Sequence, residues 1–277
     1  MTIAETFRRH WPEYAIEGWA LATFMMSAGV SAVLIWHPDL PFREAVGSEF
    51  LRRCLMGAAM GLTAIALIYS PWGRRSGAHM NPAVTLAFLR LGKIARVDAA
   101  FYIAAQFLGG AFGVLVALVL LRERFSGSPI GYIATQPGPD GTSLAFLLEA
   151  LMSFGLMLAV LYMSSSPGRM AYTGLIAGTL VAAFIVLEAP ISGMSMNPAR
   201  SFASALPAGH WNDLWIYFVA PPLGMLAAAT AYVYAGRSAH CAKLYHAADV
   251  RCIHCGYEPS TSPREHQHEE PGIQSRV

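Results

Sequence analysis

The chain has few charged residues and none of the common catalytic motifs. Charged side chains make up 13% of its 277 residues, whereas a soluble domain usually carries ~25%. Hydrophobic residues make up 55%, so we expect lipid to surround most of the chain. A formal net charge of +2 is too small to indicate a nucleic-acid partner. No nucleophile elbow, phosphate loop or histidine box is present, so we do not expect an enzyme.

Six long apolar runs stand out once charge is set aside. They cover residues 14–36, 51–70, 99–121, 144–163, 170–187 and 214–235, each close to the ~20 residues of a membrane-spanning helix. Two shorter apolar runs cover residues 81–91 and 197–206. A helix of about eleven residues reaches ~16 Å, half the hydrocarbon core. Each short run can therefore enter a membrane without crossing it.

The order of these runs repeats as span, span, half-span, span. Each half holds an odd number of spans, so the second half must lie inverted relative to the first. The sequence thus predicts an all-α membrane protein with six transmembrane helices, two re-entrant half-helices and an inverted internal repeat. The halves cover about 1–122 and 143–236, joined by a Gly- and Pro-rich linker at 122–143. Residues 1–236 form the membrane domain and 237–277 a polar tail.

Basic residues indicate how the chain lies in the membrane. The segments beside the two termini carry an excess of Lys and Arg, whereas the arginines of the opposite loops stand among Asp and Glu. This asymmetry predicts that both termini are cytoplasmic. We expect a multi-pass protein of the cell membrane (inner or plasma membrane).

Two Asn-Pro-Ala triplets begin the two short runs. Ser-Gly precedes each triplet, at 76–77 and 192–193, and the chain has only three asparagines. Asn is a favoured N-cap and Pro fits the first helical position, so one triplet would indicate only a helix start. Two copies in a symmetric six-span pattern indicate half-helices that meet in a pore. The triplets are Asn81, Pro82, Ala83, Asn197, Pro198 and Ala199.

This arrangement closely resembles the major intrinsic protein family of aquaporins and glycerol channels, in the form of a bacterial-type aquaporin-like member. The likeness covers about residues 14–236. It rests on the stretches 76–85 and 193–202, supported by Glu17, Gln106, Glu149 and Pro221-Pro222. The resemblance implies a homotetramer in which each subunit holds its own pore for water or small neutral solutes, with no cofactor required.

The residues give a mechanism once this topology is granted. Two helix N-termini meet at the midplane, each with about half a positive charge. Asn81 and Asn197 offer amide N–H groups to a passing water, whose oxygen then cannot accept from a neighbouring water. The hydrogen-bonded chain that carries protons is thereby interrupted, and the positive field repels cations.

Four further polar residues are candidates for the pore or its support. The resemblance places Arg200 at the narrowest constriction, near the outer mouth. Glu17 and Glu149 are acids inside the first span of each half, either as proton relays of a transporter or, as we favour, as acceptors for unwound backbone. The resemblance places His79 near the inner mouth of the pore. A role in bracing the loop is an alternative of nearly the same weight.

Solute choice depends on the ring around Arg200. By resemblance the other members are Met60, Ile185 and Met194, of which Met60 requires a one-residue shift in the preceding loop. Water channels of the family usually have His and an aromatic where this chain has Ile185 and Met60. A less polar, adaptable ring leaves room for glycerol, ammonia or hydrogen peroxide. Ser201 stands where glycerol channels of the family typically have Asp, so by resemblance it favours water as the permeant. We favour water, and a secondary transporter is the least favoured alternative.

The tail contains a small group of metal-ligating residues. Its polar, Pro-containing composition predicts mostly disorder. Within it, Cys252 and Cys255 have the spacing of a zinc-ligand pair, and Cys241 with His246 would complete a tetrahedral site. The alternative is a set of reduced thiols without metal in a cytoplasmic tail. A bound zinc would be structural or regulatory.

Overall fold

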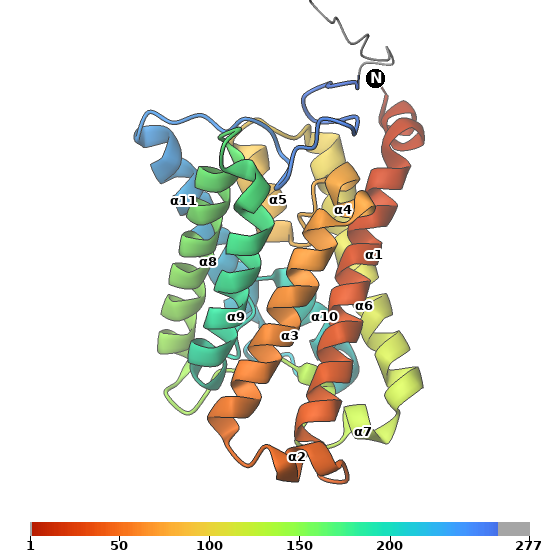
Figure 1. Ribbon diagram of the computed structural model, residues 1–277, viewed down its shortest axis with the longest axis vertical. Helices are drawn as coiled ribbons and strands as arrows, with labels where there is room; N and C mark the ends of the chain where they lie inside the picture. Colours follow the sequence, from red (N-terminus) through yellow and green to blue (C-terminus); the bar gives the residue numbers. More distant parts are fainter. Residues whose placement is uncertain (1, 260–277) are drawn as a thin grey trace, which may run out of the picture.

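Six long helices stand side by side in the computed structural model, which describes residues 2–259 (Figure 1). Each is long and apolar enough to cross a membrane. The six are α1 (Ile3–Trp36), α3 (Glu49–Tyr69), α6 (Arg96–Leu121), α8 (Thr142–Ser164), α9 (Thr173–Ser192) and α11 (Leu214–Tyr234). The N-terminal end of α1 and residues 237–259 lie at one end of the bundle, here named the terminal face, and the other end is the opposite face.

Shorter elements connect the long helices. The two half-helices are α5 (Pro82–Arg90) and α10 (Pro198–Ala208). The linker between the halves is more structured than its turn residues predict, because it contains α7 and a 3₁₀ turn, η1. The remaining short elements are α2 (Pro41–Ala45), α4 (Pro71–Ser76), α7 (Glu123–Ser126), η1 (Gly131–Ile133) and η2 (Met170–Tyr172).

Two long helices extend beyond their apolar runs. Helix α1 begins at Ile3 rather than near residue 14, because Thr2 and Glu5 form a reciprocal capping box that starts the helix among polar residues. Helix α9 continues past residue 187 through Pro190 to Ser192, and Gly193, with a φ of 76°, is its left-handed C-cap. Hydrophobicity indicates which part of a helix lies in lipid, whereas capping residues determine where the helix begins and ends.

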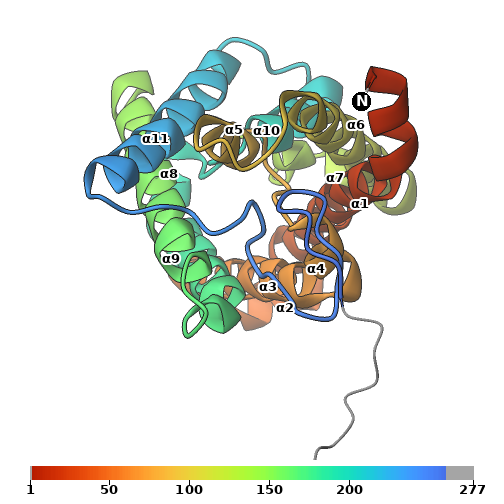
Figure 2. The same ribbon diagram turned by 90° about the horizontal axis from the view of Figure 1, so that it is seen from above.

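The two halves pack in the same way about the centre of the bundle. Helix α1 packs on α6 in the first half as α8 packs on α11 in the second. Across the halves, α3 packs on α9, α5 on α11 and α10 on α6. Figure 1 shows α5 toward the terminal face and α10 toward the opposite face, and Figure 2 shows both between α11 and α6, where they complete the ring of helices. The predicted fold class, with its inverted repeat, is confirmed.

Glycines bring the helices of the bundle into close contact. A Cβ added to Gly57 would lie 2.6 Å from the carbonyl oxygen of Ala182, and one added to Gly61 would lie 2.6 Å from that of Gly178. No side chain fits at such a distance, so α3 and α9 approach each other through their backbones. In lipid, which gives no hydrophobic drive between helices, this contact area is a main source of stability.

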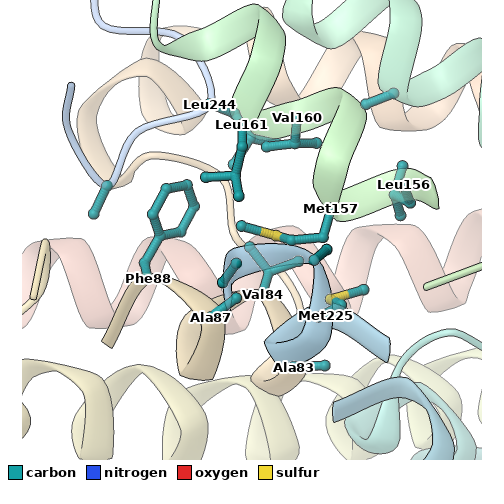
Figure 3. Packing of buried hydrophobic residues seen from close by; sticks show 14 of the residues in the cluster. Ala83, Val84, Ala87, Phe88, Leu156, Met157, Val160, Leu161, Met225 and Leu244 are labelled. Carbon is teal, nitrogen blue, oxygen red and sulfur yellow. The ribbon is translucent and has the colours of Figure 1, made fainter. Parts of the chain in front are cut away.

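An apolar cluster joins the first half-helix to the second half of the chain. Figure 3 shows Val84 and Phe88 of α5 beside Met157 and Leu161 of α8. All four side chains are buried. Leu244 of the tail belongs to the same cluster. The packing fixes α5 against helices of the other half, so the two halves cannot separate without exposing this core.

The tail does not behave as its composition predicts. Residues 237–259 form no helix or strand, yet Cys241, Ala242, Lys243, Leu244 and Cys252 are buried. The prediction of disorder is therefore wrong for this part of the tail. The tail is polar on average, and this average does not reveal the few apolar and cysteine side chains that pack against the terminal face. Residues 260–277 lie outside the described part of the chain.

Candidate functional site

Each triplet forms the start of a half-helix. The Oδ1 atom of Asn81 accepts from the backbone N–H of Ala83 at 2.8 Å, and Oδ1 of Asn197 accepts from that of Ala199 at 3.0 Å and of Arg200 at 3.3 Å. The prolines take the first helical positions, where no backbone donor is needed. Asn-Pro-Ala thus produces the same local structure twice.

The two asparagines also tie the halves together. Nδ2 of Asn81 donates to the carbonyl oxygen of Met196 at 2.7 Å, and Nδ2 of Asn197 donates to that of Met80 at 2.7 Å. An amide nitrogen carries two hydrogens, so each asparagine keeps one donor beyond this bond. Both residues line the same cavity, and that donor is available to a molecule inside it.

The loops before the half-helices have an unusual backbone that buried carboxylates support. Ala78, Met80, Met194 and Met196 all have φ between 47° and 54°, a region that non-glycine residues rarely occupy. Such a conformation persists only where surrounding contacts enforce it, and two consecutive N–H groups in each loop donate to one carboxylate.

Glu17 and Glu149 are those carboxylates. Glu17 accepts from the backbone of His79 at 3.0 Å and of Met80 at 2.7 Å. Glu149 accepts from Ser195 at 2.6 Å and Met196 at 2.7 Å. Both acids are fully buried. These contacts are those of loop support, since unpaired N–H groups cannot remain in lipid.

Two serines and two tyrosines complete the support, and the sequence argument missed this role. Ser76 Oγ donates to Glu17 at 2.8 Å, and Ser192 Oγ donates to Glu149 at 3.1 Å. Tyr102 and Tyr217 then donate to the carbonyl oxygens of Ser76 and Ser192 at 2.8 and 2.7 Å. The repeated Ser-Gly before each triplet was the available signal, whereas nothing local marks the tyrosines.

One cavity of about 500 Å³ runs along the bundle past both triplets. Trp36 and Arg53 line it near the opposite face, and Val160 and Leu244 line it at the end near the terminal face. The structure brings every residue of the ring inferred from the resemblance to this cavity. These residues are Met60, Ile185, Met194 and Arg200.

Arg200 is held by the linker between the halves. Its Nη1 donates to Oγ1 of Thr135, and Thr135 also accepts from Ser201 Oγ at 3.0 Å. Thr135 is buried and fixes where the guanidinium lies along the cavity. Sequence reasoning missed Thr135, because a threonine in a Gly- and Pro-rich linker carries no distinguishing pattern.

His79 combines the two roles considered for it. It lines the cavity, and its Nδ1 lies 3.0 Å from Thr85 Oγ1 within the loop and first half-helix. Its Nε2 donates to the carbonyl oxygen of Ala242 in the tail at 2.6 Å. His79 therefore links the pore lining to the tail.

The four tail residues with metal-ligating side chains lie together. The ligand atoms of Cys241, His246, Cys252 and Cys255 are all within 4.8 Å of one another. The Cys241 thiol, 3.4 Å from the Cys252 sulfur, lowers the pKa of Cys252 to about 4, and backbone N–H groups of Cys255 and His254 act in the same direction. This shift favours the thiolate of Cys252, the form in which a cysteine binds metal.

Comparisons with known proteins agree with this geometry. A sequence model of the family "Major intrinsic protein" matches residues 15–234. Aquaporin TIP4-4 of Zea mays is 39% identical over 194 residues, which cover 65% of this chain and 75% of that protein. Aquaporin NIP3-1 of Arabidopsis thaliana is 36% identical over 217 residues, 75% of this chain and 62% of the relative's length.

A solved structure supports the fold. The X-ray structure of the aquaglyceroporin from Plasmodium falciparum superimposes with a TM-score of 0.64 at 20% identity, covering 80% of this chain and 95% of the other. The family match spans most of the chain and includes both half-helices. The chain therefore belongs to the major intrinsic protein family and is a multi-pass membrane channel, not an enzyme, for water and small neutral solutes.

Proposed function

We propose that water is the main permeant and that protons and ions are excluded at the two asparagines. The observation that carries this proposal is the pair of free amide donors, one from each half, on a single cavity. Two half-helix N-termini add positive potential at the same place. A water held by both donors cannot pass a proton to the next water, and a cation meets an unfavourable field.

Arg200 and its ring would set the size limit. A guanidinium fixed by Thr135 places donors and a charge on one side of the cavity, while Met60, Ile185 and Met194 supply apolar walls. Such a ring orients water on one side only. The apolar walls favour a second candidate function, passage of glycerol, ammonia or hydrogen peroxide beside water.

The channel domain in this proposal is residues 1–236 and the tail is 237–277. The terminal face is cytoplasmic, in accord with the excess of basic residues there, and the membrane is the cell membrane. Large apolar side chains on the outside of α6, including Leu108, Phe112 and Val119, suit contact with lipid or with other copies in a homotetramer. Chemical cross-linking in native membranes should then yield a four-subunit product.

Permeation itself needs no cofactor in this account. The polar groups at the asparagines and around Arg200 come from the chain. A zinc ion held by Cys241, His246, Cys252 and Cys255 would be structural or regulatory and would supply none of these polar groups.

Stopped-flow light scattering on proteoliposomes tests the proposed permeant. Leu244 lines the end of the cavity near the terminal face, and its replacement by Ala widens the cavity there. The wild type and Leu244→Ala are therefore measured in parallel. We expect water permeability above that of empty liposomes, and slower glycerol entry, in Leu244→Ala. Glycerol entry as fast as water would favour the second candidate. Empty-liposome rates in both proteins would contradict a channel.

Arg200 is tested in the Leu244→Ala background. Arg200→Ala removes the charge and the widest side chain of the ring, so glycerol permeability should rise several-fold and proton flux should increase. Arg8→Ala, a change of the same type near the N-terminus, is the control. Unchanged selectivity in the Arg200 variant would show that Arg200 does not limit passage.

A further inference from the structure

The tail segment 239–255 lies across the terminal end of the pore cavity. Seen from the terminal face, Figure 2 shows the tail crossing the centre of the ring of helices. Two hydrogen bonds attach it to the first re-entrant loop: Leu244 N–H donates to Gly77 O at 3.1 Å, and His79 Nε2 donates to Ala242 O at 2.6 Å. The segment is therefore docked on the pore lining itself.

Leu244 is the tail side chain that reaches the cavity. It is 5% exposed, and it lines the cavity together with Val84, Val160 and Ile68. Figure 3 shows it beside Val160 and Leu161. These four apolar side chains offer no hydrogen bond to a chain of water molecules passing between them.

Polar contacts on both sides of Leu244 hold the segment down. Buried Lys243 donates from Nζ to the carbonyl oxygens of Arg74 and Arg251, both at 2.9 Å. Further along, His254 lies 3.2 Å from Ser76 O and 3.3 Å from Tyr102 OH. Ser76 and Tyr102 also support the first re-entrant loop, so the tail rests on the same framework as the pore.

The Cys/His group has the geometry of a tetrahedral zinc site. Zinc binds sulfur at about 2.3 Å and imidazole nitrogen at about 2.0 Å, which places neighbouring ligand atoms roughly 3.5–3.8 Å apart. Sγ of Cys241 and Cys252 are 3.4 Å apart, and Nε2 of His246 is 3.2 Å from Sγ of Cys255. Small movements bring all four ligands to one ion, and three thiolates with one imidazole match structural zinc sites.

Neither of the alternatives accounts for the whole group. A disulfide has a sulfur–sulfur distance of about 2.05 Å and would use only two of the four residues. Unliganded thiols give no reason for a histidine to stand with three cysteines whose ligand atoms, like its own, all lie within 4.8 Å of one another. Three thiolates and Zn²⁺ carry one net negative charge, and the buried ammonium of Lys243 supplies the matching positive charge.

We propose that Cys241, His246, Cys252 and Cys255 bind one zinc ion, and that the zinc-bound segment closes the terminal end of the pore with the side chain of Leu244. The ligands come from both sides of Leu244 in the sequence, so one ion sets the position of the intervening chain. Loss of zinc frees the segment and opens the pore. This inference rests on the proposed channel function, because a closing segment has an effect only on a pore that conducts.

Zinc content and water permeability of the same purified full-length protein test the proposal. The wild type should contain one zinc per subunit by elemental analysis and conduct water little faster than empty liposomes. A zinc chelator, added with a reductant to prevent disulfides, should raise its permeability roughly tenfold, as expected for losing the burial of one Leu side chain. Added zinc should reverse the rise.

Variants separate metal binding from closure. Cys252→Ser with Cys255→Ser should lose the zinc and conduct without chelator. Leu244→Ala should keep its zinc yet conduct, because the lost atoms leave room for water. The controls Cys54→Ser, a cysteine on α3 outside the group, and Leu62→Ala, an exposed side chain on the same helix, should behave as the wild type.

Each remaining outcome counts against a defined part of the proposal. Wild-type protein without zinc overturns the metal site. Zinc-bound wild type that conducts as well as Leu244→Ala overturns the closure alone. Protein that stays at the empty-liposome rate in every variant and with chelator overturns the channel function, and the closing role with it.

Discussion

The buried carboxylates of the two halves should both tolerate substitution poorly. In Glu149→Gln, the amide oxygen can still accept from Ser192 and Ser195, but the amide nitrogen then faces the N–H of Met196, which donates to Glu149 Oε2 at 2.7 Å in the wild type. One charge-assisted hydrogen bond is lost and two donors face each other. We expect the free energy of unfolding to fall by about 2–4 kcal/mol.

Glu17→Gln should cost at least as much, because the oxygen that the amide nitrogen replaces accepts from two donors instead of one. Oε2 of Glu17 accepts from Met80 N–H at 2.7 Å and from Gln106 Nε2 at 2.9 Å. Oε1 of Gln106 is buried without a hydrogen-bond partner among the described residues. Rotation of the Gln106 amide would let that oxygen accept from the new side chain. It would also move Gln106 Nε2 away from Thr85 Oγ1, its acceptor at 3.2 Å, so two donors, Met80 N–H and Gln106 Nε2, are left unpaired.

Denaturant unfolding in mixed micelles measures both losses, with the exposed Glu123→Gln as control. The second assay is water permeability in the Leu244→Ala background, which should fall in proportion to the loss of folded protein. Wild-type stability in Glu149→Gln would refute the assignment of the carboxylate as backbone support. If the protein with Glu149 showed uptake driven by a proton gradient and a stable Glu149→Gln variant did not, the carboxylate would be a proton relay.

Two further substitutions test the packing and the ring. Gly61→Ala places a Cβ against the carbonyl oxygen of Gly178 and should lower the free energy of unfolding by about 1–3 kcal/mol. The control Gly155→Ala in α8 adds a Cβ with nothing within 4 Å, so it should not lower the free energy of unfolding. Equal effects of the two substitutions would refute the close contact between α3 and α9. Met60→Phe narrows the cavity. In the Leu244→Ala background it should reduce glycerol permeability several-fold more than water permeability in stopped-flow assays, and an equal reduction would place Met60 outside the ring.

The features that sequence predicted well are those that local chemistry determines. Asn-Pro-Ala specifies a cap and a first helical residue wherever it occurs, so Asn81 and Asn197 identified both half-helices and their starts. Length and polarity specify which helices can cross a membrane. The inversion of the halves followed from counting spans, which requires no knowledge of packing.

The features that sequence did not predict depend on contacts between distant segments. Thr135 meets Arg200 only because the linker folds back to the opposite end of the cavity. Tyr102 and Tyr217 reach the re-entrant loops across the bundle. Leu244 is an ordinary residue of a polar tail until the terminal face gives it apolar neighbours, so composition predicted disorder where the chain is docked.

The temperature dependence of water permeability in Leu244→Ala proteoliposomes tests the account most directly. A continuous pore in which water passes along fixed donors should give an activation energy close to that of water diffusing in bulk water. The rate should remain proportional to the osmotic gradient without saturation, and proton flux should stay at the level of empty liposomes. A steep temperature dependence, saturation or accompanying proton flux would contradict a passive pore interrupted by Asn81 and Asn197.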